Sequence, residues 1–568
     1  MALEQLKVHE IVKQALGKSV DIPEFQREFV WDPEKVKKLA ESLYRDYPVG
    51  SFLLWDSSNY QESKTAQGSV AALWIVDGQQ RTTALCLLLG QKPYWWSDAQ
   101  NWNESMERYD VMVNILPDDD DERLEFSLPN PVRKREPRWL SIRSVLCFDK
   151  VDGLTSYARQ IAKGLVDGPD PENEILMQFF AKVHPRLLHI WEIRNRDIPV
   201  VKIAHEVEDV AEIFARLNQE GTRVKEADVV LAMAAVRNPG WVREKYLPFR
   251  SDLEDRGWDL DAGIFVRTMT GIGHGRARLV EVPKQFWRPE NLIPIWNLAS
   301  QTITEVLLKR FAEYGIFSTE LLPSSNSLIP LFVLHHRWGS HQGYSFGRAL
   351  HWFLLANRDG RYSGAAINSL NEDVRAIMSE AQDFDQALHN LMKRLHVSEA
   401  TEADDFLKRY DRWGGGRGFP RLMLYLLLVQ SGARDWVDGT KIGYDKTGVP
   451  IAAGFEPQWH HIFARTVLKK AGEPEDYSNA LANITVVNER TNVNKLSGKP
   501  PARYIQQFHI TGESLQAHFV PQKYAGFTGK DQLEQLWDVK RFQDFLIERA
   551  DLLAQASNAF LQNLVRTH

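Results

Sequence analysis

Four residues near the C-terminal end of the chain are the ones best suited to chemistry: His460, His461, Asn483 and Asn492. The sequence around them predicts a short strand that ends at the histidines, a second strand that begins at Asn483, and a short helix that carries Asn492. A neutral imidazole can remove a proton from water near pH 7. Imidazole nitrogen and carboxamide oxygen can both bind a divalent cation, which stabilises charge on a leaving oxygen. Together these groups are suited to hydrolysis of a phosphodiester.

The two histidines are adjacent, so their roles depend on local geometry. Adjacent side chains of a strand point to opposite faces, and a bend at the end of the strand can relax that rule. His460 and His461 can therefore have different roles. A His-His pair by itself is common on protein surfaces and in cores, and we expect His335-His336 to be such a pair.

The order and spacing of the four residues resemble a ββα-metal (HNH) nuclease. The resemblance implies that His460 and Asn492 are ligands of Mg²⁺ or Mn²⁺. It also implies that His461 is the general base and that Asn483 orients the hairpin and the base. All four residue types stand where the HNH pattern has them or tolerates them.

The same resemblance places Lys495, together with Arg490, against phosphate. Many HNH proteins have an acidic residue at the position of His460, so the metal preference is open. No Cys-x-x-Cys pair accompanies the motif, so no structural zinc site is expected around it.

Three motifs in the N-terminal part are expected to meet in the fold. They are Pro-Glu-Phe-Gln-Arg-Glu-Phe-Val-Trp at 23–31, Val-Asp-Gly-Gln-Gln-Arg-Thr-Thr at 76–83, and Phe-Ala-Arg-Leu-Asn-Gln-Glu-Gly-Thr at 214–222. The arginine in each motif offers a forked donor for phosphate. Asp77 could hold a metal or a sugar hydroxyl, and Gly78 allows close backbone approach. The alternative is that each arginine pairs with a nearby acid and that the motifs are structural.

These motifs resemble the N-terminal domain of the GmrSD family of type IV restriction enzymes, whose core is similar to the ParB/sulfiredoxin fold. Asp-Gly-Gln-Gln-Arg is the most specific mark of that domain, and the family joins the domain to an HNH-type nuclease. The resemblance covers roughly residues 5–235 and 405–510. It implies a nucleotide-binding set made of Gln26, Arg27, Asp77, Gly78, Gln79, Gln80, Arg81, Arg216 and Asn218.

The function implied by the resemblance is nucleotide-stimulated cleavage of foreign, often base-modified, double-stranded DNA in defence against phage. The nucleotide is an NTP, with ATP, GTP and others left open. One alternative is a nucleotide-gated sensor of modified DNA, for example phosphorothioate DNA, with nicking activity. Another is an NTPase-type defence protein for which DNA binding is incidental. A homodimer and an assembly with partner defence proteins are both left open.

The bulk composition is that of a soluble protein with several domains. The chain has 568 residues, 43% hydrophobic and 25% charged, which predicts two to four globular domains. A formal net charge of −6 gives no overall attraction to nucleic acid, so DNA contacts must come from local basic patches. Arg133-Lys134-Arg135 with Arg138 is one candidate, although a solvated loop is the favoured interpretation.

Cysteine usage and hydropathy indicate a cytoplasmic protein without a membrane segment. The two cysteines, Cys86 and Cys147, give no disulfide framework and fit a reducing compartment. The N-terminus lacks the apolar core of a signal peptide. The longest apolar runs, near 84–89 and 422–429, are too short to span a bilayer.

We expect an α+β multidomain chain: a ParB/sulfiredoxin-like nucleotide- and DNA-sensing domain at 1–237, a helical middle at 238–404, and a mostly helical nuclease domain at 405–568. The glycines at 414–416 and 418 are interpreted as a hinge or loop. Asp32-Pro33 is typical of a helix start. The expected strands are 52–55, 73–76, 109–115 and 196–203. The expected helices are 7–16, 34–44, one from Thr82, 207–217 and those near 530–556.

Overall fold

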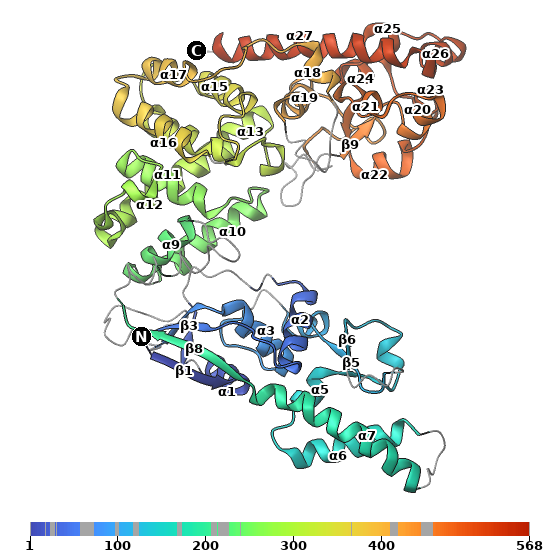
Figure 1. Ribbon diagram of the computed structural model, residues 1–568. Coiled ribbons are helices and arrows are strands. Elements are labelled where there is room, and N and C mark those ends of the chain that lie inside the picture. The colour runs from blue at the N-terminus through green and yellow to red at the C-terminus, as the bar shows by residue number, and fades with distance from the viewer. Residues whose placement is uncertain are drawn as a thin grey trace. The chain divides into compact units, whose positions relative to one another are not determined.

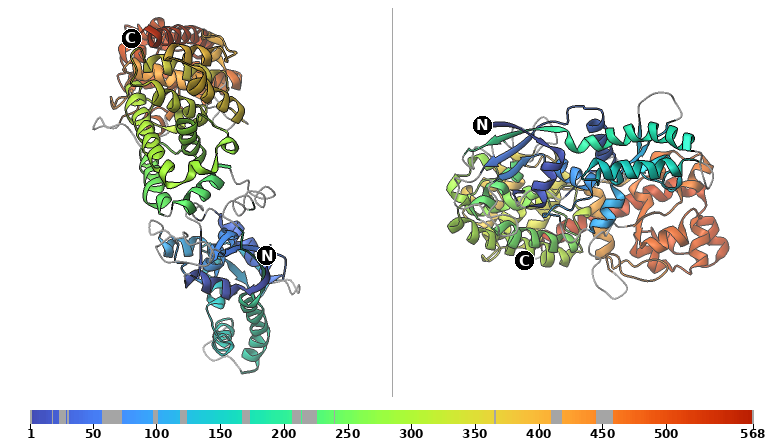
Figure 2. Two further views of the ribbon diagram at one scale, coloured as in Figure 1. Left: turned by 90° about the vertical axis from the view of Figure 1, so that its left-hand side faces the viewer. Right: turned by 90° about the horizontal axis from the view of Figure 1, so that it is seen from below.

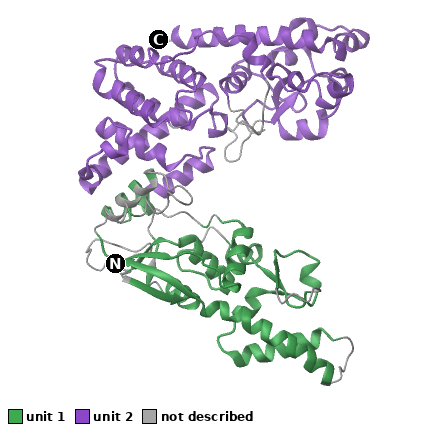
Figure 3. Cartoon of the chain, in the orientation of Figure 1, with its two compact units in different colours: residues 1–245 green, residues 246–568 purple. Residues whose placement is uncertain are grey.

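The structure is a computed structural model that describes residues 2–17, 19–22, 29, 31–56, 73–96, 101–117, 124–166, 173–205, 213, 226–238, 240–364, 366–408, 418–444 and 458–566. The chain is mixed α+β, mostly helical and multidomain. It divides into two compact units, an N-terminal unit (Met1–Lys245) and a C-terminal unit (Tyr246–His568) (Figure 3). The ParB/sulfiredoxin-like fold, the HNH core and the division at residue 404 stay predictions.

A five-stranded mixed sheet forms the centre of the N-terminal unit. Its strand order is β1-β8-β3-β4-β2. The β8/β3 and β4/β2 pairs are parallel, whereas β1/β8 and β3/β4 are antiparallel. The strands are β1 (Ala2–Lys7), β2 (Val20–Asp21), β3 (Phe52–Asp56), β4 (Leu73–Asp77) and β8 (Asp197–Ile203).

Side chains on the two faces of this sheet belong to two separate apolar clusters, because successive residues of a strand point to opposite faces. Phe52 and Leu54 of β3, with Ile75 of β4, join the large core of the unit. The residues between them, such as Leu53 and Trp74, form a smaller cluster on the other face. This is the period of two that a strand buried on both faces requires. Both strands are therefore held from two sides, which fixes the position of the turn that follows β4.

Helices cover the face of the large core (Figure 1). Helix α1 buries Val8, Ile11, Val12 and Ala15, the spacing of one helical stripe. Helix α2 begins as predicted, because the Asp32 carboxylate accepts the Lys35 N–H and Pro33 occupies the first turn. The helices of this group are α1 (Val8–Leu16), α2 (Pro33–Tyr44) and α3 (Gln79–Leu89).

Helix α3 begins at Gln79, three residues earlier than the predicted start at Thr82. The reason is Gly78, whose φ of +106° turns the chain directly from β4 into the helix. The strand expected at 109–115 is also shorter, because Tyr109 caps the end of helix α4 (Trp102–Arg108) and strand β5 (Met112–Asn114) begins only at Met112. The predicted helix at 207–217 lies outside the described residues except for Ile213.

A small three-stranded sheet and a helical hairpin complete the described part of the N-terminal unit. The hairpin helices α6 and α7 lie side by side and project from the rest of the unit (Figure 1, and Figure 2, left). These elements are α4 (Trp102–Arg108), β5 (Met112–Asn114), β6 (Glu125–Ser127), β7 (Trp139–Ser141), α5 (Ile142–Leu146), α6 (Val151–Gly164), α7 (Asn173–Trp191) and α9 (Glu226–Arg237).

In the described part of the C-terminal unit, helices surround one hairpin made of β9 (Gln458–His461) and β10 (Ile484–Val487). The helices before the hairpin are α10 (Leu247–Asp255), α11 (Ala262–His274), α12 (Pro289–Glu305), α13 (Phe311–Tyr314), α14 (Leu328–Trp338), α15 (Phe346–Arg358), α16 (Ile367–Arg375), α17 (Phe384–Met392), α18 (Ala403–Leu407) and α19 (Phe419–Gln430). Those after β9 are α20 (Arg465–Ala471), α21 (Glu475–Ser478), α22 (Glu489–Thr491), α23 (Pro501–Gln507), α24 (Gly512–Ala517), α25 (Gln522–Ala525), α26 (Lys530–Leu536) and α27 (Phe542–Arg566).

Helix α27 joins the helical part of this unit to the hairpin. It packs against α15, α18 and α19, and against the turn Leu481–Asn483 that opens β10. Its fully buried Arg549 donates to the carbonyls of Ala482 and Ile484 (2.7 and 2.8 Å) and of His518 (3.0 Å). Burial lowers the pKa of Arg549 to about 9. One side chain thus holds three carbonyls around the hairpin.

In the part of the chain with assigned positions, no helix has the length and apolar character needed to cross a membrane.

We predict that Arg549→Met destabilises the C-terminal unit by at least about 2 kcal/mol, because three buried carbonyls lose their donor. Urea unfolding measures the change. Ile547→Ala on the same helix is the control, because Ile547 is exposed and its loss should cost little. Equal stability of Arg549→Met and the wild type would mean that the cost of burying the guanidinium cancels its hydrogen bonds.

Candidate active site

The β9/β10 hairpin brings the predicted residues of the C-terminal unit together. The strands are antiparallel, with Ile484 opposite His461 and Thr485 opposite His460. His460 faces the interior and is 3% exposed, whereas His461 is only partly buried. The two side chains therefore have separate environments, as different roles require. After β10 the chain enters α22 and a wider π-helical turn, Asn492–Leu496, a type of turn found frequently at functional sites.

The side chains of His460 and Asn492 lie in direct contact. His460 Nδ1 is 2.9 Å from Asn492 Oδ1. Burial lowers the pKa of His460 to about 4, so its imidazole is neutral at physiological pH. Its Nε2 atom is buried, and no described residue forms a hydrogen bond with it. Because the amide oxygen can only accept, the contact is a hydrogen bond in which His460 Nδ1–H donates to Asn492 Oδ1. Nδ1 could bind a cation only after this proton had moved to Nε2.

This pair fits a divalent metal ion. With the proton on Nε2, His460 Nδ1 and Asn492 Oδ1 would be an imidazole nitrogen and a carboxamide oxygen side by side, two ligand types that Mg²⁺ or Mn²⁺ accepts. Magnesium in proteins commonly keeps several waters and few protein ligands. Among the described residues, no three His, Cys, Asp or Glu side chains gather to hold a metal. A bound ion would therefore be held by two neutral protein groups, with solvent or substrate oxygens completing its coordination.

Asn483 lies at the centre of the hairpin and is fully buried. Its Oδ1 accepts the Phe463 N–H (2.8 Å), and its Nδ2 donates to the carbonyls of Phe463 (3.0 Å) and Ser478 (2.8 Å). These bonds join the segment after His461 to the end of α21. Asn483 thus joins the two segments, and its predicted role in orienting the base stays a prediction.

His461 contacts Asn479, a residue that the sequence interpretation missed. His461 Nε2 lies 3.0 Å from Asn479 Oδ1. Burial lowers the pKa of His461, the hydrogen bond with Asn479 raises it, and the charge of Arg465 lowers it, with a net shift downward. The imidazole therefore keeps a lone pair at neutral pH. The only signal in the sequence was the spacing of Asn479 and Asn483, four residues apart.

Asp435 is a second residue that the sequence interpretation missed. Its carboxylate, 3% exposed, accepts the N–H groups of Val437, Asp438 and Asn488 and the hydroxyl of Thr491. A buried carboxylate needs such donors to compensate for lost water. Asp435 thereby fixes the start of α22, the segment that ends at Asn492.

A buried ring cluster supports the hairpin from behind. His518 Nδ1 is 2.7 Å from the Thr485 hydroxyl, and His518 Nε2 is 2.7 Å from the Arg434 carbonyl. The carbonyl can only accept, so Nε2 carries the proton and Nδ1 accepts from Thr485. The Trp436 ring contacts the rings of both His460 and His518, with centres 6.0 and 4.9 Å apart. Packing against these rings thus fixes the orientation of the buried His460 imidazole.

The other residues named in the sequence analysis of the C-terminal unit lie either on the surface or in the helical core. Lys495 and Arg490 are exposed, near Asn492 in the sequence. His335 is buried between helices, with Nδ1 2.8 Å from the Tyr344 hydroxyl and Nε2 3.5 Å from the Glu305 carboxylate. That histidine belongs to the helical core, as expected for the second His-His pair.

The Asp-Gly-Gln-Gln-Arg turn joins β4 to α3 in the N-terminal unit. Arg81 donates to the Asp77 carboxylate (2.6 Å) and to the Val49 carbonyl (2.8 Å), and its guanidinium lies 4.9 Å from the centre of the Phe52 ring. A Cβ atom on Gly78 would meet the Phe52 ring at 2.5 Å, so only glycine fits there. Arg81 thus has a partner within the unit, which is the arrangement expected of a structural motif.

The other predicted nucleotide-binding residues are only partly placed. Gln79 and Gln80 are half-buried in the first turn of α3. Gln26, Arg27, Arg216 and Asn218 lie outside the described residues, so the meeting of the three motifs stays a prediction.

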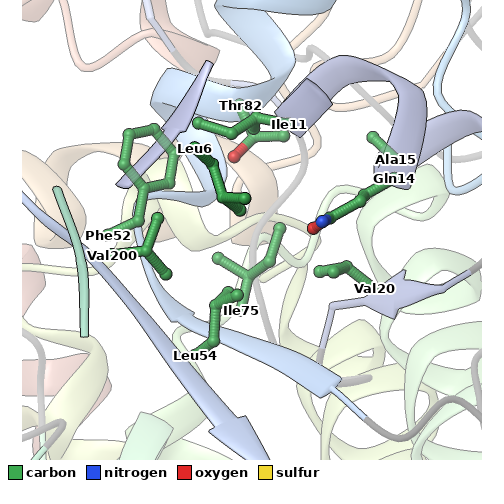
Figure 4. A pocket seen from close by; sticks show the side chains of 10 residues that line it. All are labelled: Leu6, Ile11, Gln14, Ala15, Val20, Phe52, Leu54, Ile75, Thr82 and Val200. Atoms are coloured by element: carbon green, nitrogen blue, oxygen red, sulfur yellow. The ribbon is translucent and has the colours of Figure 1, made fainter. Parts of the chain in front are cut away.

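The cavity beneath this turn is too small for a nucleotide. It has a volume of about 10 Å³, enough for at most one water, and lies between α1 and the sheet (Figure 4). Its wall is apolar apart from Gln14 and Thr82, and the Thr82 hydroxyl donates to the Gly78 carbonyl. A nucleotide would have to bind elsewhere on the unit.

The basic run at 133–135 is partly used by the fold. Arg133 lies over the Trp139 ring and donates to the Leu128 carbonyl. Lys134 and Arg135 line an open pocket of about 730 Å³, whose wall also holds carboxylates, among them Glu104. Charges of both signs give no strong basic patch at this place.

Comparison with known proteins bears on the N-terminal unit. Residues 8–235 match the family model of the GmrSD restriction endonuclease, N-terminal domain. The match supports the resemblance drawn from the three motifs. An uncharacterized protein of Methanocaldococcus jannaschii is 19% identical over 534 residues, which cover 88% of this chain and 86% of that protein. The matched domain ends before the hairpin, so the HNH assignment stays a prediction.

We predict that the C-terminal unit loses stability as the pH falls below about 6.5, the value at which histidines of the unfolded chain begin to bind protons. In the folded chain burial holds the pKa of His460 at about 4 and that of His518 at about 3. Between these values the unfolded chain binds more protons, so the free energy of unfolding decreases as the pH is lowered. Urea unfolding from pH 7 to pH 4 should show a loss of roughly 2 kcal/mol or more.

His518→Gln should reduce this pH dependence, since it removes one of the two groups. His396→Gln, at an exposed histidine of the same unit, is the control for loss of a histidine as such. A pH dependence unchanged by His518→Gln would contradict the prediction.

Proposed function

We propose that the chain is a metal-dependent DNA endonuclease of the type IV restriction kind, stimulated by nucleotide and directed against modified phage DNA in the cytoplasm. The observation that carries the proposal is the contact between His460 and Asn492 on the hairpin that also presents His461. The GmrSD match of the N-terminal unit supports a restriction role.

In the proposed reaction His461 takes a proton from the attacking water, and the water oxygen forms a bond to phosphorus as the bond from phosphorus to the leaving oxygen breaks. The leaving oxygen then takes a proton from solvent. A divalent cation held by His460 and Asn492 would, when bound, stabilise negative charge on the leaving oxygen. Asn483 holds the segment that carries His461, so the base does not have to be ordered during the reaction. Lys495 and Arg490, both exposed, are assigned to contacts with the DNA backbone.

The nucleotide is assigned to the N-terminal unit through the residues of the Asp-Gly-Gln-Gln-Arg turn. A phosphate would have to take Arg81 from Asp77, which would free that carboxylate for a sugar hydroxyl or a metal. The ion pair between them also favours a second candidate, in which the turn is structural and the unit senses modified DNA without using this turn for nucleotide. Variants of the two residues distinguish these candidates.

The nuclease prediction concerns three residues. His461→Ala should lower DNA cleavage by about 10²–10⁴-fold, because a general base contributes that much to the rate. His460→Ala and Asn492→Ala should raise the concentration of Mg²⁺ or Mn²⁺ needed for cleavage, since each removes a ligand. EDTA should stop the wild type. The measurement is cleavage of modified and unmodified phage DNA with each metal and each NTP.

The control is His396→Ala, an exposed histidine in the same unit. It should cut DNA like the wild type. Cleavage by His461→Ala at the wild-type rate, or cleavage by the wild type in EDTA, would refute the assignment of base and metal.

The nucleotide prediction concerns Asp77→Ala and Arg81→Ala. Both should weaken nucleotide binding or hydrolysis, because the turn loses a carboxylate or a phosphate fork. The C-terminal unit should remain folded. Arg196→Ala is the matched control, because Arg196 pairs with Asp46 at 3.1 Å in the same unit. If both variants bind and hydrolyse NTP normally, the structural candidate is correct.

A further inference from the structure

The Asn479 side chain adopts one orientation for a chemical reason. Its Nδ2 donates to the Glu475 carbonyl at 3.1 Å. A carbonyl oxygen can only accept, so the amide nitrogen must face Glu475 and the amide oxygen must face His461. Asn479 is 5% exposed, so water does not offer alternative partners.

This orientation determines where His461 carries its proton. His461 Nε2 lies 3.0 Å from Asn479 Oδ1, and two acceptors cannot share a hydrogen bond. Nε2 must therefore be the N–H nitrogen, which leaves the lone pair on Nδ1. No described residue forms a hydrogen bond with Nδ1, so that atom remains available for water.

From this geometry we infer that Asn479 is a positioning residue, which holds His461 in the Nε2–H form so that Nδ1 is the atom that takes the proton from water. The inference rests on the proposed nuclease function. In the step itself an O–H bond of water breaks, an Nδ1–H bond forms, and the imidazolium that results donates from Nε2 to Asn479 Oδ1. The oxygen of Asn479 then faces a positive charge, which strengthens the bond.

Asn483 places both partners of this pair. Its amide binds the N–H and carbonyl of Phe463, two residues after His461, and the carbonyl of Ser478, one residue before Asn479. The distance between His461 and Asn479 is therefore fixed through a third, fully buried side chain. A variant at Asn479 alone would keep the hydrogen bonds of Asn483, so the role of Asn479 can be tested separately.

The first test reads the tautomer directly. The full chain, with ¹⁵N only in its 16 histidines, is studied by two-bond ¹H–¹⁵N correlation at about pH 8. The His461 signals are assigned by their loss in His461→Gln. The wild type should show an N–H type Nε2 and an unprotonated Nδ1. An N–H at Nδ1 would overturn the inference, whether or not the protein cuts DNA.

The second test compares variants at adjacent positions. Asn479→Leu should remove the preference for Nε2–H and lower kcat by about 10²-fold, the smaller part of what a general base contributes, with KM unchanged. Asn479→Asp keeps an acceptor oxygen toward His461 but loses the donor to the Glu475 carbonyl, so it should restore kcat only in part. Ser478→Ala is the control, because its hydroxyl donates only to the Pro474 carbonyl on the same turn (3.2 Å). It should behave like the wild type.

The outcomes separate this inference from the proposed function. If the wild type cuts no DNA with any metal, the nuclease proposal fails, while the tautomer spectrum still decides the role of Asn479. If the wild type cuts DNA and Asn479→Leu keeps its kcat, Asn479 has no role in positioning the base. If Asn479→Leu does not fold, the role of Asn479 is decided by the tautomer of His461 in the wild-type spectrum and by the kcat of Asn479→Asp.

Discussion

The buried amide of Asn483 is the interaction on which the candidate active site depends. A carboxamide away from water is costly unless its polar atoms find partners, and here both Nδ2 hydrogens and Oδ1 do. Its partners are backbone groups of two segments that are distant in sequence. The segment after His461 and the end of α21 can therefore take only one relative position. The contact of His461 with Asn479 follows from this position, and so does the course of the chain into β10.

Around the hairpin, three buried ionisable groups are held in neutral or backbone-bound form. His460 and His518 are held neutral by burial, and Arg549 binds carbonyls and no carboxylate among the described residues. This choice has a consequence for metal binding. A ligand pair of imidazole and carboxamide carries no charge, so it attracts a hard cation less than carboxylates would, and substrate phosphate must supply the missing negative charge. Such a site would be filled best when DNA is present.

Local patterns in the sequence predicted local structure well. The Asp32 cap and the alternating burial of β3 and β4 depend on neighbours within a few residues. The two strands of the hairpin pair residues more than twenty positions apart, and they were predicted from the order and spacing of the HNH pattern. Other interactions between distant segments were missed. Asp435 binds α22 more than fifty residues later, and Arg549 reaches carbonyls more than sixty residues earlier. Asn479 was missed for another reason. Its proposed role depends on which amide atom faces His461, and the hydrogen bond to the Glu475 carbonyl determines that orientation.

The ion pair in the N-terminal unit shows how a structural contact and a binding role can coexist. The side chains of Arg81 and Asp77 are 17% and 39% exposed, so their attraction is screened by water, and pairs of this kind contribute about 0–1 kcal/mol. Opening such a pair costs little. A phosphate with two or more negative charges could form two parallel bonds with the same guanidinium, which is a stronger arrangement than one contact with a carboxylate. Meanwhile the Val49 carbonyl and the Phe52 ring would keep Arg81 in place. The observed pair is therefore compatible with the proposed phosphate site, because it would keep the arginine ordered at a small energetic cost until a phosphate took the place of the aspartate.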